Sequence, residues 1–210
     1  MYKMVKVVTL NVGRLIPFLN RFFPIRKSSI EKVKSKLKEI DADIILLQEV
    51  VGQRHLEELV EGTGYYSVLG PPYENERYLE NVALLSNREI REINYVPESN
   101  AISVLIPDYN IDTVNVHLSL RRKKRLKQIK SLLSKIKLRR TILGGDFNDY
   151  IGENPIGNFH SCTYQIGSTT LYGRHIDDIL HTPDVRAESA KIVNSRFGLM
   201  DHYPVMAIVS

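Results

Sequence analysis

The stretch T-I-L-G-G-D-F-N-D, residues 141–149, decides the fold of this 210-residue chain. A short apolar run, typical of a buried strand, ends in two glycines that allow a turn and a close approach of another group. Asp146 and Asn148 follow, and side chains two residues apart on an extended segment point the same way. A carboxylate beside a carboxamide suits phosphate-ester hydrolysis, because it pairs a base for water with a donor to a phosphoryl oxygen. The stretch therefore predicts a reactive site at the end of a buried strand.

Further elements on both sides of this stretch predict an α/β protein. A capping-box pattern, Ser28 to Glu31, predicts the start of a helix, and other helices are expected at 54–61 and within 121–140. Residues 107–110 interrupt two apolar runs and predict a hairpin. Because strands and helices alternate early while hairpins occur mid-chain, we expect sheets that are not purely parallel. Strands are predicted at 5–10, 44–47, 66–69, 82–85, 101–106, 111–118, 142–143, 176–180 and 205–209.

Length and composition predict one soluble domain spanning residues 1–210. A chain of this size can bury a sufficient core without covalent staples. The single cysteine, Cys162, cannot form an internal disulfide, which fits a reducing compartment. Lys3 and Lys6 interrupt the N-terminal apolar run that a signal peptide needs, and no later stretch is long enough to span a bilayer. We therefore expect a cytoplasmic protein with no transmembrane segment.

One segment makes the chain basic. Residues 121–140 hold 11 Lys or Arg and no acid, which leaves 18 basic and 24 acidic residues elsewhere, a net charge of −6. Such concentration indicates a polyanion or an anionic surface as partner, although a solvated helix face has the same pattern. The first four basic residues directly follow the predicted strand at 111–118. The candidate substrate contacts are therefore Arg121, Arg122, Lys123 and Lys124.

Polar side chains recur where the predicted strands end. Open α/β sheets place their sites at such ends. Each residue has a simple structural explanation when taken alone: Asn11 could cap a turn, and His117 could be a hydrogen-bonded core residue. Six such positions in sequence are harder to explain that way. They are Asn11, Gln48–Glu49, His117, Asp146 with Asn148, Asp177 or Asp178, and Asp201–His202.

Taken in order, these positions resemble the motifs of the endonuclease/exonuclease/phosphatase superfamily, the deoxyribonuclease I-like phosphoesterases. The segments are V-V-T-L-N-V-G, D-A-D-I-I-L-L-Q-E-V, V-N-V-H-L-S-L, L-G-G-D-F-N-D, R-H-I-D-D-I-L and G-L-M-D-H-Y-P-V. The resemblance covers nearly the whole chain. It implies a four-layer α/β sandwich, two packed mixed β-sheets flanked by helices, with the site at one sheet edge. It also implies phosphodiester hydrolysis with Mg²⁺ or Mn²⁺ as cofactor.

The resemblance also implies which residues handle the cation and the attacking water. Glu49 would hold a divalent cation, with Asn11 and Asp201 close to it, and hard cations of this kind prefer oxygen ligands. Asp146 would orient or deprotonate the water. Asn148 would hold water or phosphate.

Two histidines complete the implied set. His202 would donate to the scissile phosphate, and Asp177 on its other ring nitrogen would fix its tautomer. Asp178 is the neighbour on the opposite face of the strand. His117 would lie opposite His202, near the leaving oxygen.

Departures from one branch of the superfamily narrow the implied activity. Apurinic/apyrimidinic endonucleases read W-N and Q-E-T-K, whereas this chain has no tryptophan, follows Q-E with Val50 and Val51, and contains V-H-L. The pattern therefore favours deoxyribonuclease-like enzymes, phosphodiesterases and phosphatases. In deoxyribonuclease I-like enzymes a glutamate orients the histidine that matches His117. Glu76 in E-R-Y-L is the candidate here, with Glu80 as its rival.

Residues 13–27 interleave phenylalanines with arginines, and three interpretations stay open. The segment could form a small packed lobe, stack on bases, or face lipid. For the whole chain the sequence predicts a metal-dependent nuclease with nucleic acid as substrate. A small or lipid-linked phosphoester, of the inositol phosphate or sphingomyelin type, is the alternative substrate. A non-catalytic binding module is disfavoured, because every aligned position carries a competent residue type.

Overall fold

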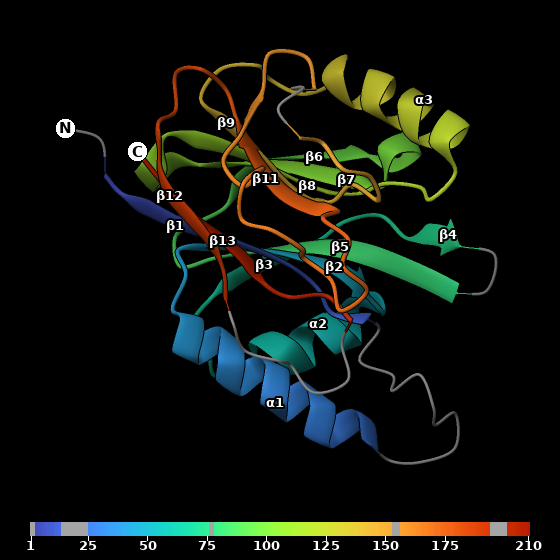
Figure 1. Cartoon of the computed structure of the whole chain (residues 1–210). Coiled ribbons are helices and arrows are strands. Elements are labelled where there is room, and N and C mark those ends of the chain that lie inside the picture. The colour runs from blue at the N-terminus through green and yellow to red at the C-terminus, as the bar shows by residue number, and fades with distance from the viewer. Residues whose placement is uncertain (1–2, 14–24, 76–77, 153–155, 194–200) are drawn as a thin grey trace.

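A computed structural model describes residues 3–13, 25–75, 78–152, 156–193 and 201–210. Two β-sheets pack face to face, and helices cover their outer faces (Figure 1). α1 (Ile25–Ile40) and α2 (Gly52–Val60) lie against one sheet, and α3 (Arg122–Leu133) lies against the other. This arrangement confirms the predicted four-layer sandwich. Among the described residues, no helix combines the length and apolar character needed to cross a membrane.

The first sheet carries the N-terminal and C-terminal strands side by side. β1 and β2 run parallel, joined through α1, and the other pairs are antiparallel. The short strand β4 (Tyr73–Asn75) pairs with β5 outside the main order. That order is β12 (Ala187–Ile192), β13 (Val205–Val209), β1 (Val5–Asn11), β2 (Ile44–Val50), β5 (Tyr78–Ser86) and β3 (Tyr66–Leu69).

The second sheet, like the first, contains one parallel pair of strands, and its other pairs are antiparallel. β8 and β9 are the parallel pair, and α3 connects them. The 3-10 turn η3 (Pro107–Tyr109) joins β7 to β8 as the predicted hairpin, and η2 (Pro97–Ser99) precedes β7. The strand order is β10 (His160–Ser161), β11 (Asp177–His181), β9 (Thr141–Asp146), β8 (Ile111–His117), β7 (Ala101–Ile106) and β6 (Arg91–Val96).

Alternation along the strands divides the core into three layers. On β2, Leu46 faces the second sheet, whereas Leu47 packs beneath α1 and α2. The two glycines of β9 lie where atoms of neighbouring strands leave no room for a side chain. A Cβ on Gly144 would lie 2.6 Å from Leu46 Cδ1, and one on Gly145 would lie 2.0 Å from the Val116 carbonyl oxygen. Gly145 also has φ +145°, so a side chain there would be both strained and in collision with β8.

Strand register brings the candidate residues to one edge of the sandwich. Asn11 is opposite Gln48 across the β1–β2 pair. His117 is opposite Asp146 across β8–β9, and Asp146 is opposite Asp177 across β9–β11. Because both parallel pairs end at the same edge, residues far apart in sequence meet there.

A buried polar bridge joins the two sheets just behind this edge. The Gln48 amide donates to Asn115 Oδ1 at 2.7 Å and to Thr9 Oγ1 at 3.1 Å. Asn115 Nδ2 in turn donates to the carbonyls of Leu47 and Ala83, both at 2.8 Å. Buried amides are tolerated only when hydrogen-bonded, so the bridge fixes the relative position of the sheets where the site begins.

Asn115→Ala should lower the free energy of unfolding by about 1–3 kcal/mol or more, since Gln48 and two carbonyls would lose a buried partner. Denaturant titration measures this change. The exposed Asn94, which donates to the Lys135 carbonyl, supplies the control, and Asn94→Ala should change stability by less than about 0.5 kcal/mol. Equal effects of the two substitutions would contradict a stabilising role for the bridge.

The predicted start of the first helix was wrong in detail. α1 begins at Ile25 and not at Ser28, so the capping-box pattern lies inside the helix. In α3, the apolar Leu126 is 56% exposed, while the neighbouring Arg125 is buried. Arg125 donates to the carbonyls of Ser119 and Leu120 and pairs with Asp149, and these contacts compensate for its burial.

Candidate active site

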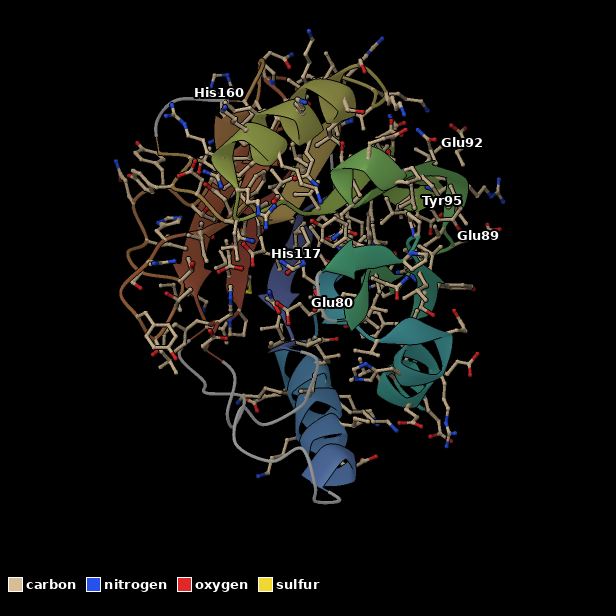
Figure 2. All side chains as sticks on the ribbon, turned by 90° about the vertical axis from the view of Figure 1, so that its right-hand side faces the viewer. Glu80, Glu89, Glu92, Tyr95, His117 and His160 are labelled. Carbon is tan, nitrogen blue, oxygen red and sulfur yellow. The ribbon has the colours of Figure 1, made fainter. Side chains whose placement is uncertain are left out.

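A cleft of about 280 Å³ opens at the edge where the strands end, on the side that faces the viewer in Figure 2. It contains six of the predicted site residues and several that the sequence did not single out. Asn11 and Asp177 are buried behind this lining. The lining residues are Glu49, Tyr73, His117, Leu118, Ser119, Leu120, Asp146, Asn148, Thr170, Tyr172, Arg174, Ile176, Asp201 and His202.

Asp146 is at the centre of the site. Its Oδ2 accepts a hydrogen bond from Asn11 Nδ2 at 3.1 Å and lies 3.6 Å from His117 Nε2 and 3.9 Å from His202 Nε2. The other oxygen, Oδ1, accepts the backbone N–H of Asn148 at 2.8 Å. The carboxylate thus lies beside two imidazoles, that of His117 at the end of β8 and that of His202 in the segment before β13.

Burial raises the pKa of Asp146, and the neighbouring Asp177 carboxylate raises it further. The two histidines and the hydrogen bond from Asn11 oppose this effect. A carboxyl group whose pKa is raised is a better proton acceptor near neutral pH than an exposed aspartate.

The ring of His202 contacts the Asp177 carboxylate on the side away from Asp146. Its Nδ1 lies 2.9 Å from Asp177 Oδ2, which also accepts the hydroxyl of Thr169 at 2.7 Å. Burial favours the neutral ring, but the charges of Asp177, Asp146 and Asp201 together with the Asp177 hydrogen bond outweigh it. They raise the pKa of His202 to about 10. The ring is therefore an imidazolium at neutral pH, with Nε2 as a donor on the cleft side.

Asp178 lies on the opposite face of β11 from Asp177 and contacts other residues. Its carboxylate accepts hydrogen bonds from Ser161 and Thr163 and from the N–H of Ile179. Burial raises the pKa of Asp178 to about 6 against these hydrogen bonds. Asp178 therefore anchors the segment around β10 and has no contact with the cleft.

Glu80 is the glutamate beside His117. Glu80 Oε2 lies 4.0 Å from His117 Nδ1, and Figure 2 shows the two side chains close together. Glu80 is fully buried on the same face of β5 as Val82, which explains its reach into the space between the sheets. Glu76, the first candidate from the sequence, lies outside the described residues.

Glu49 enters the cleft through an irregular point of β2. The β2–β5 register shifts between Leu47 and Val50, and Glu49 has a left-handed backbone with φ 59°. Bulges and left-handed non-glycine residues are strained features that commonly redirect a side chain at a functional site. Asn11 Nδ2 donates to Glu49 Oε1 at 3.1 Å and so links Glu49 to Asp146.

Asn148 lines the cleft with a left-handed backbone of φ 51°. Its Nδ2 donates to the Leu118 carbonyl at 2.8 Å, which ties the turn after β9 to the end of β8. Asp201 lines the opposite part of the cleft, and its carbonyl accepts the N–H of Leu171 at 2.8 Å. All predicted site residues near the strand ends are thus brought together, apart from the undescribed Glu76.

The four basic residues predicted to contact the substrate lie along one rim of the cleft. Arg121, Arg122, Lys123 and Lys124 are exposed at the start of α3, directly after the cleft residues Ser119 and Leu120. Lys124 Nζ donates to the hydroxyl of Tyr73, another cleft residue, at 2.9 Å and lies 4.7 Å from the centre of its ring. Of the aromatic and basic segment 13–27, residues 14–24 lie outside the described part of the chain.

The chemistry of the site fits a divalent cation. Asp146, Asp177 and His202 place one ligand atom each within 4.8 Å of one another, as do Glu49, Glu80 and His117. These groups offer carboxylate oxygens and imidazole nitrogens with no thiolate, a set suited to Mg²⁺ or Mn²⁺. Burial and the Asp177 carboxylate disfavour the charged form of Asp146 and raise its pKa, and a nearby cation would stabilise that form.

Sequence reasoning missed the side walls of the cleft. Tyr73 and Tyr172 line it outside the motif segments, while Leu120 and Arg174 are end residues of two such segments to which the sequence assigned no role. Leu120 ends the V-N-V-H-L-S-L segment and Tyr172-Gly-Arg174 precedes the I-D pair, so proximity to the motifs was the available signal. Residue type alone gave no indication, because isolated leucines and tyrosines are usually buried.

Comparison with known proteins identifies the architecture. The structure matches endonuclease/exonuclease/phosphatase proteins from Beutenbergia cavernae (14% identity, TM-score 0.77, 99% of this chain and 71% of that chain) and Bacteroides vulgatus (17%, 0.74, 99% and 99%). It also matches a 3'-5' exonuclease from Neisseria meningitidis (17%, 0.71, 96% and 98%). At these identities the likeness concerns the fold alone.

A family model gives the same result from the sequence. Among curated proteins, none matches the chain significantly. The model of the Endonuclease/Exonuclease/phosphatase family matches residues 8–196, which include every strand-end residue of the site except Asp201 and His202. The chain therefore belongs to the endonuclease/exonuclease/phosphatase family and has its deoxyribonuclease I-like fold.

Proposed function

We propose that this protein is a divalent-metal-dependent phosphodiesterase that hydrolyses polynucleotides. The observation that carries the proposal is the Asp146 carboxylate between the imidazoles of His117 and His202, with a second carboxylate behind His202. Phosphodiester hydrolysis needs a base for water, a cationic donor for the phosphoryl oxygens and a group near the leaving oxygen. This arrangement supplies one candidate for each need.

The contacts of each residue define its proposed role in catalysis. Asp146 orients the attacking water and accepts its proton, and the Asn148 N–H and Asn11 amide hold the carboxylate in place. The His202 imidazolium donates Nε2–H to a phosphoryl oxygen, while Asp177 keeps the ring charged and oriented. His117 faces the leaving oxygen from the other side, with Glu80 behind it. The Asn148 side-chain amide groups that are not bonded to the Leu118 carbonyl bind water or phosphate.

Glu49 would hold Mg²⁺ or Mn²⁺, with Asn11 and Asp201 beside it. A bound cation of this kind neutralises phosphoryl charge and stabilises the leaving oxygen. Asn11 contributes by fixing the Glu49 and Asp146 carboxylates relative to each other, since its amide donates to both.

The start of α3 supports a polymeric substrate. The first turn of α3 contains no acidic residue and several basic ones, although the positive end of the helix dipole disfavours cations there. Clustered positive charge at the rim of the cleft lowers the stability of the fold unless an anion neutralises it. A phosphate backbone that leaves the cleft across this rim would do so.

Replacing Arg121, Arg122, Lys123 and Lys124 with Gln should weaken polynucleotide cleavage and flatten its salt dependence. Each lost phosphate contact removes roughly 0.7–0.9 from the slope of log affinity against log salt. Hydrolysis of a small chromogenic phosphodiester, too short to reach the rim, should change far less. The measurement is cleavage rate against salt concentration for both substrates.

A control variant removes four lysines farther from the cleft: Lys127, Lys130, Lys135 and Lys137. Lys137 pairs with Glu92, which Figure 2 shows well away from His117. Equal losses in both variants would indicate a general charge effect, and equal losses on both substrates would indicate a folding role. No loss on either substrate would favour a small phosphoester as the natural substrate.

The activity itself is tested by incubating the protein with Mg²⁺ and labelled DNA, RNA, inositol phosphates and sphingomyelin. Cleavage of a nucleic acid with rates well above those on the small phosphoesters is the expected result. Faster hydrolysis of a lipid-linked or inositol phosphoester would overturn the proposed substrate class, and the same catalytic residues would then serve it.

A further inference from the structure

Two large apolar side chains are exposed at the mouth of the cleft. Leu120 is 74% exposed and Tyr172 is 78% exposed, and both line the cleft. Leu120 follows the His117 strand, while Tyr172 belongs to the turn beside His202. Since His117 and His202 lie on either side of Asp146, these two side chains border the site from both sides. Because they line the cleft, both side chains are available to contact a ligand that binds there.

The turn that carries Tyr172 is held in place by hydrogen bonds. The N–H groups of Thr169 and Thr170 both donate to the Arg174 carbonyl, at 2.8 and 3.0 Å, and the Arg174 N–H donates to Thr170 Oγ1 at 3.0 Å. The turn is also joined to the catalytic segment, because Thr170 pairs with His202 and the Leu171 N–H donates to the Asp201 carbonyl. Because the turn is already ordered, the Tyr172 ring would lose little further conformational entropy when it binds a flat partner.

Charge beside these apolar groups indicates what the partner carries. Arg174 lines the cleft two residues after Tyr172, and Lys124 lies at the other rim against Tyr73. An apolar or aromatic face next to cations matches a nucleotide, in which a flat base adjoins a phosphate. A lipid surface would instead require a broad apolar face with cations around it.

We propose that Tyr172 stacks on an unpaired nucleobase adjacent to the scissile phosphate, with Leu120 contacting that nucleotide from the other side and Arg174 binding its phosphate. This inference rests on the proposed function and adds strandedness to it. A base within a duplex is already covered by its neighbours on both faces, so only a single strand or a frayed end can offer a free face to the ring. The protein therefore prefers single-stranded over double-stranded substrate.

Affinity measured without turnover tests the contact separately from catalysis. Fluorescence anisotropy with a labelled oligonucleotide in excess chelator compares the wild-type protein with Tyr172→Ala and Tyr172→Phe. Tyr172→Ala should weaken binding of the single strand by roughly 5- to 100-fold, the range for loss of one base–aromatic contact. Tyr172→Phe should retain most of the affinity, because the stacking face remains. The control Tyr66→Ala removes a tyrosine that is 55% exposed on β3, outside the cleft lining, and should have no effect.

A duplex of the same sequence completes the experiment. We expect weaker duplex binding by wild-type protein and little further loss in Tyr172→Ala. Equal affinity for both forms, or equal affinity of wild type and Tyr172→Ala for the single strand, would overturn the stacking contact. A Tyr172-dependent interaction with anionic phospholipid vesicles but not with the oligonucleotide would also overturn it. If the stacking contact holds but Mg²⁺ gives no cleavage, the proposed catalytic function fails and the binding inference stands.

Discussion

Asp146→Asn should lower turnover on the order of 10²-fold or more, because the amide cannot accept the proton of the attacking water. The side chain keeps its size and Oδ1 can still accept the Asn148 N–H, while the new Nδ2 cannot accept the hydrogen bond that Asn11 donates to Oδ2. Burial raises the pKa of Asp146, so the charged form carries a desolvation cost that the neutral amide avoids. This gain offsets the lost hydrogen bond from Asn11, so we expect a melting temperature close to that of the wild type, together with the loss of activity.

Asp149→Asn is the matched control, because it makes the same chemical change three residues farther along the chain. The exposed Asp149 pairs with the buried Arg125 and does not line the cleft. Its replacement should leave turnover within a few-fold of wild type. Initial rates on the preferred phosphodiester and thermal melting curves of both variants provide the comparison. Near-native turnover by Asp146→Asn on every substrate tested would remove Asp146 from its proposed role.

Strand alternation explains why the fold was predictable. On β2 the residues alternate between the inter-sheet core and the helix-covered face, and the apolar run with Gly144 and Gly145 fixes β9. The strands that the sequence did not reveal are β4, β6, β10 and β12. They lie at the margins of the sheets, and β6 and β12 are largely exposed, so no apolar run marks them. Their pairing depends on neighbouring strands and not on their own composition.

The site was predictable where a motif lay at a strand end and unpredictable where a side chain reaches it from elsewhere. Register places Asn11, His117 and Asp146 at one edge, and the motif order already indicated this. The choice between Glu76 and Glu80 depends on how far β5 extends between the sheets, which local sequence does not specify. The turn with Tyr172 is close to Asp177 in sequence, but only its pairing with the His202 segment shows that it borders the cleft.

Removal of divalent cations should abolish hydrolysis completely, and Glu49→Gln should act mainly through metal affinity. The bulge in β2 directs Glu49 into the cleft, where other side chains also offer oxygen ligands for a cation. Because activity depends on that cation, excess chelator should leave no activity. The variant keeps the side-chain length and the hydrogen-bonding capacity toward Asn11 but loses the charge that attracts the cation. We expect the half-saturating Mg²⁺ concentration to rise on the order of 10-fold or more, with partial recovery of rate at high Mg²⁺.

Rate measured against free Mg²⁺ separates this effect from a loss of the catalytic group. Asp146→Asn should not recover at any Mg²⁺ concentration, whereas Glu49→Gln should approach wild-type turnover as the concentration increases. Glu57→Gln on α2 is the matched control, because Glu57 is exposed and contacts only Gln53 among the described hydrogen bonds of its side chain. Its Mg²⁺ dependence should equal that of the wild type. Full hydrolysis in excess chelator would exclude a metal-dependent mechanism, and a Glu49→Gln defect insensitive to Mg²⁺ would place Glu49 in a role other than metal binding.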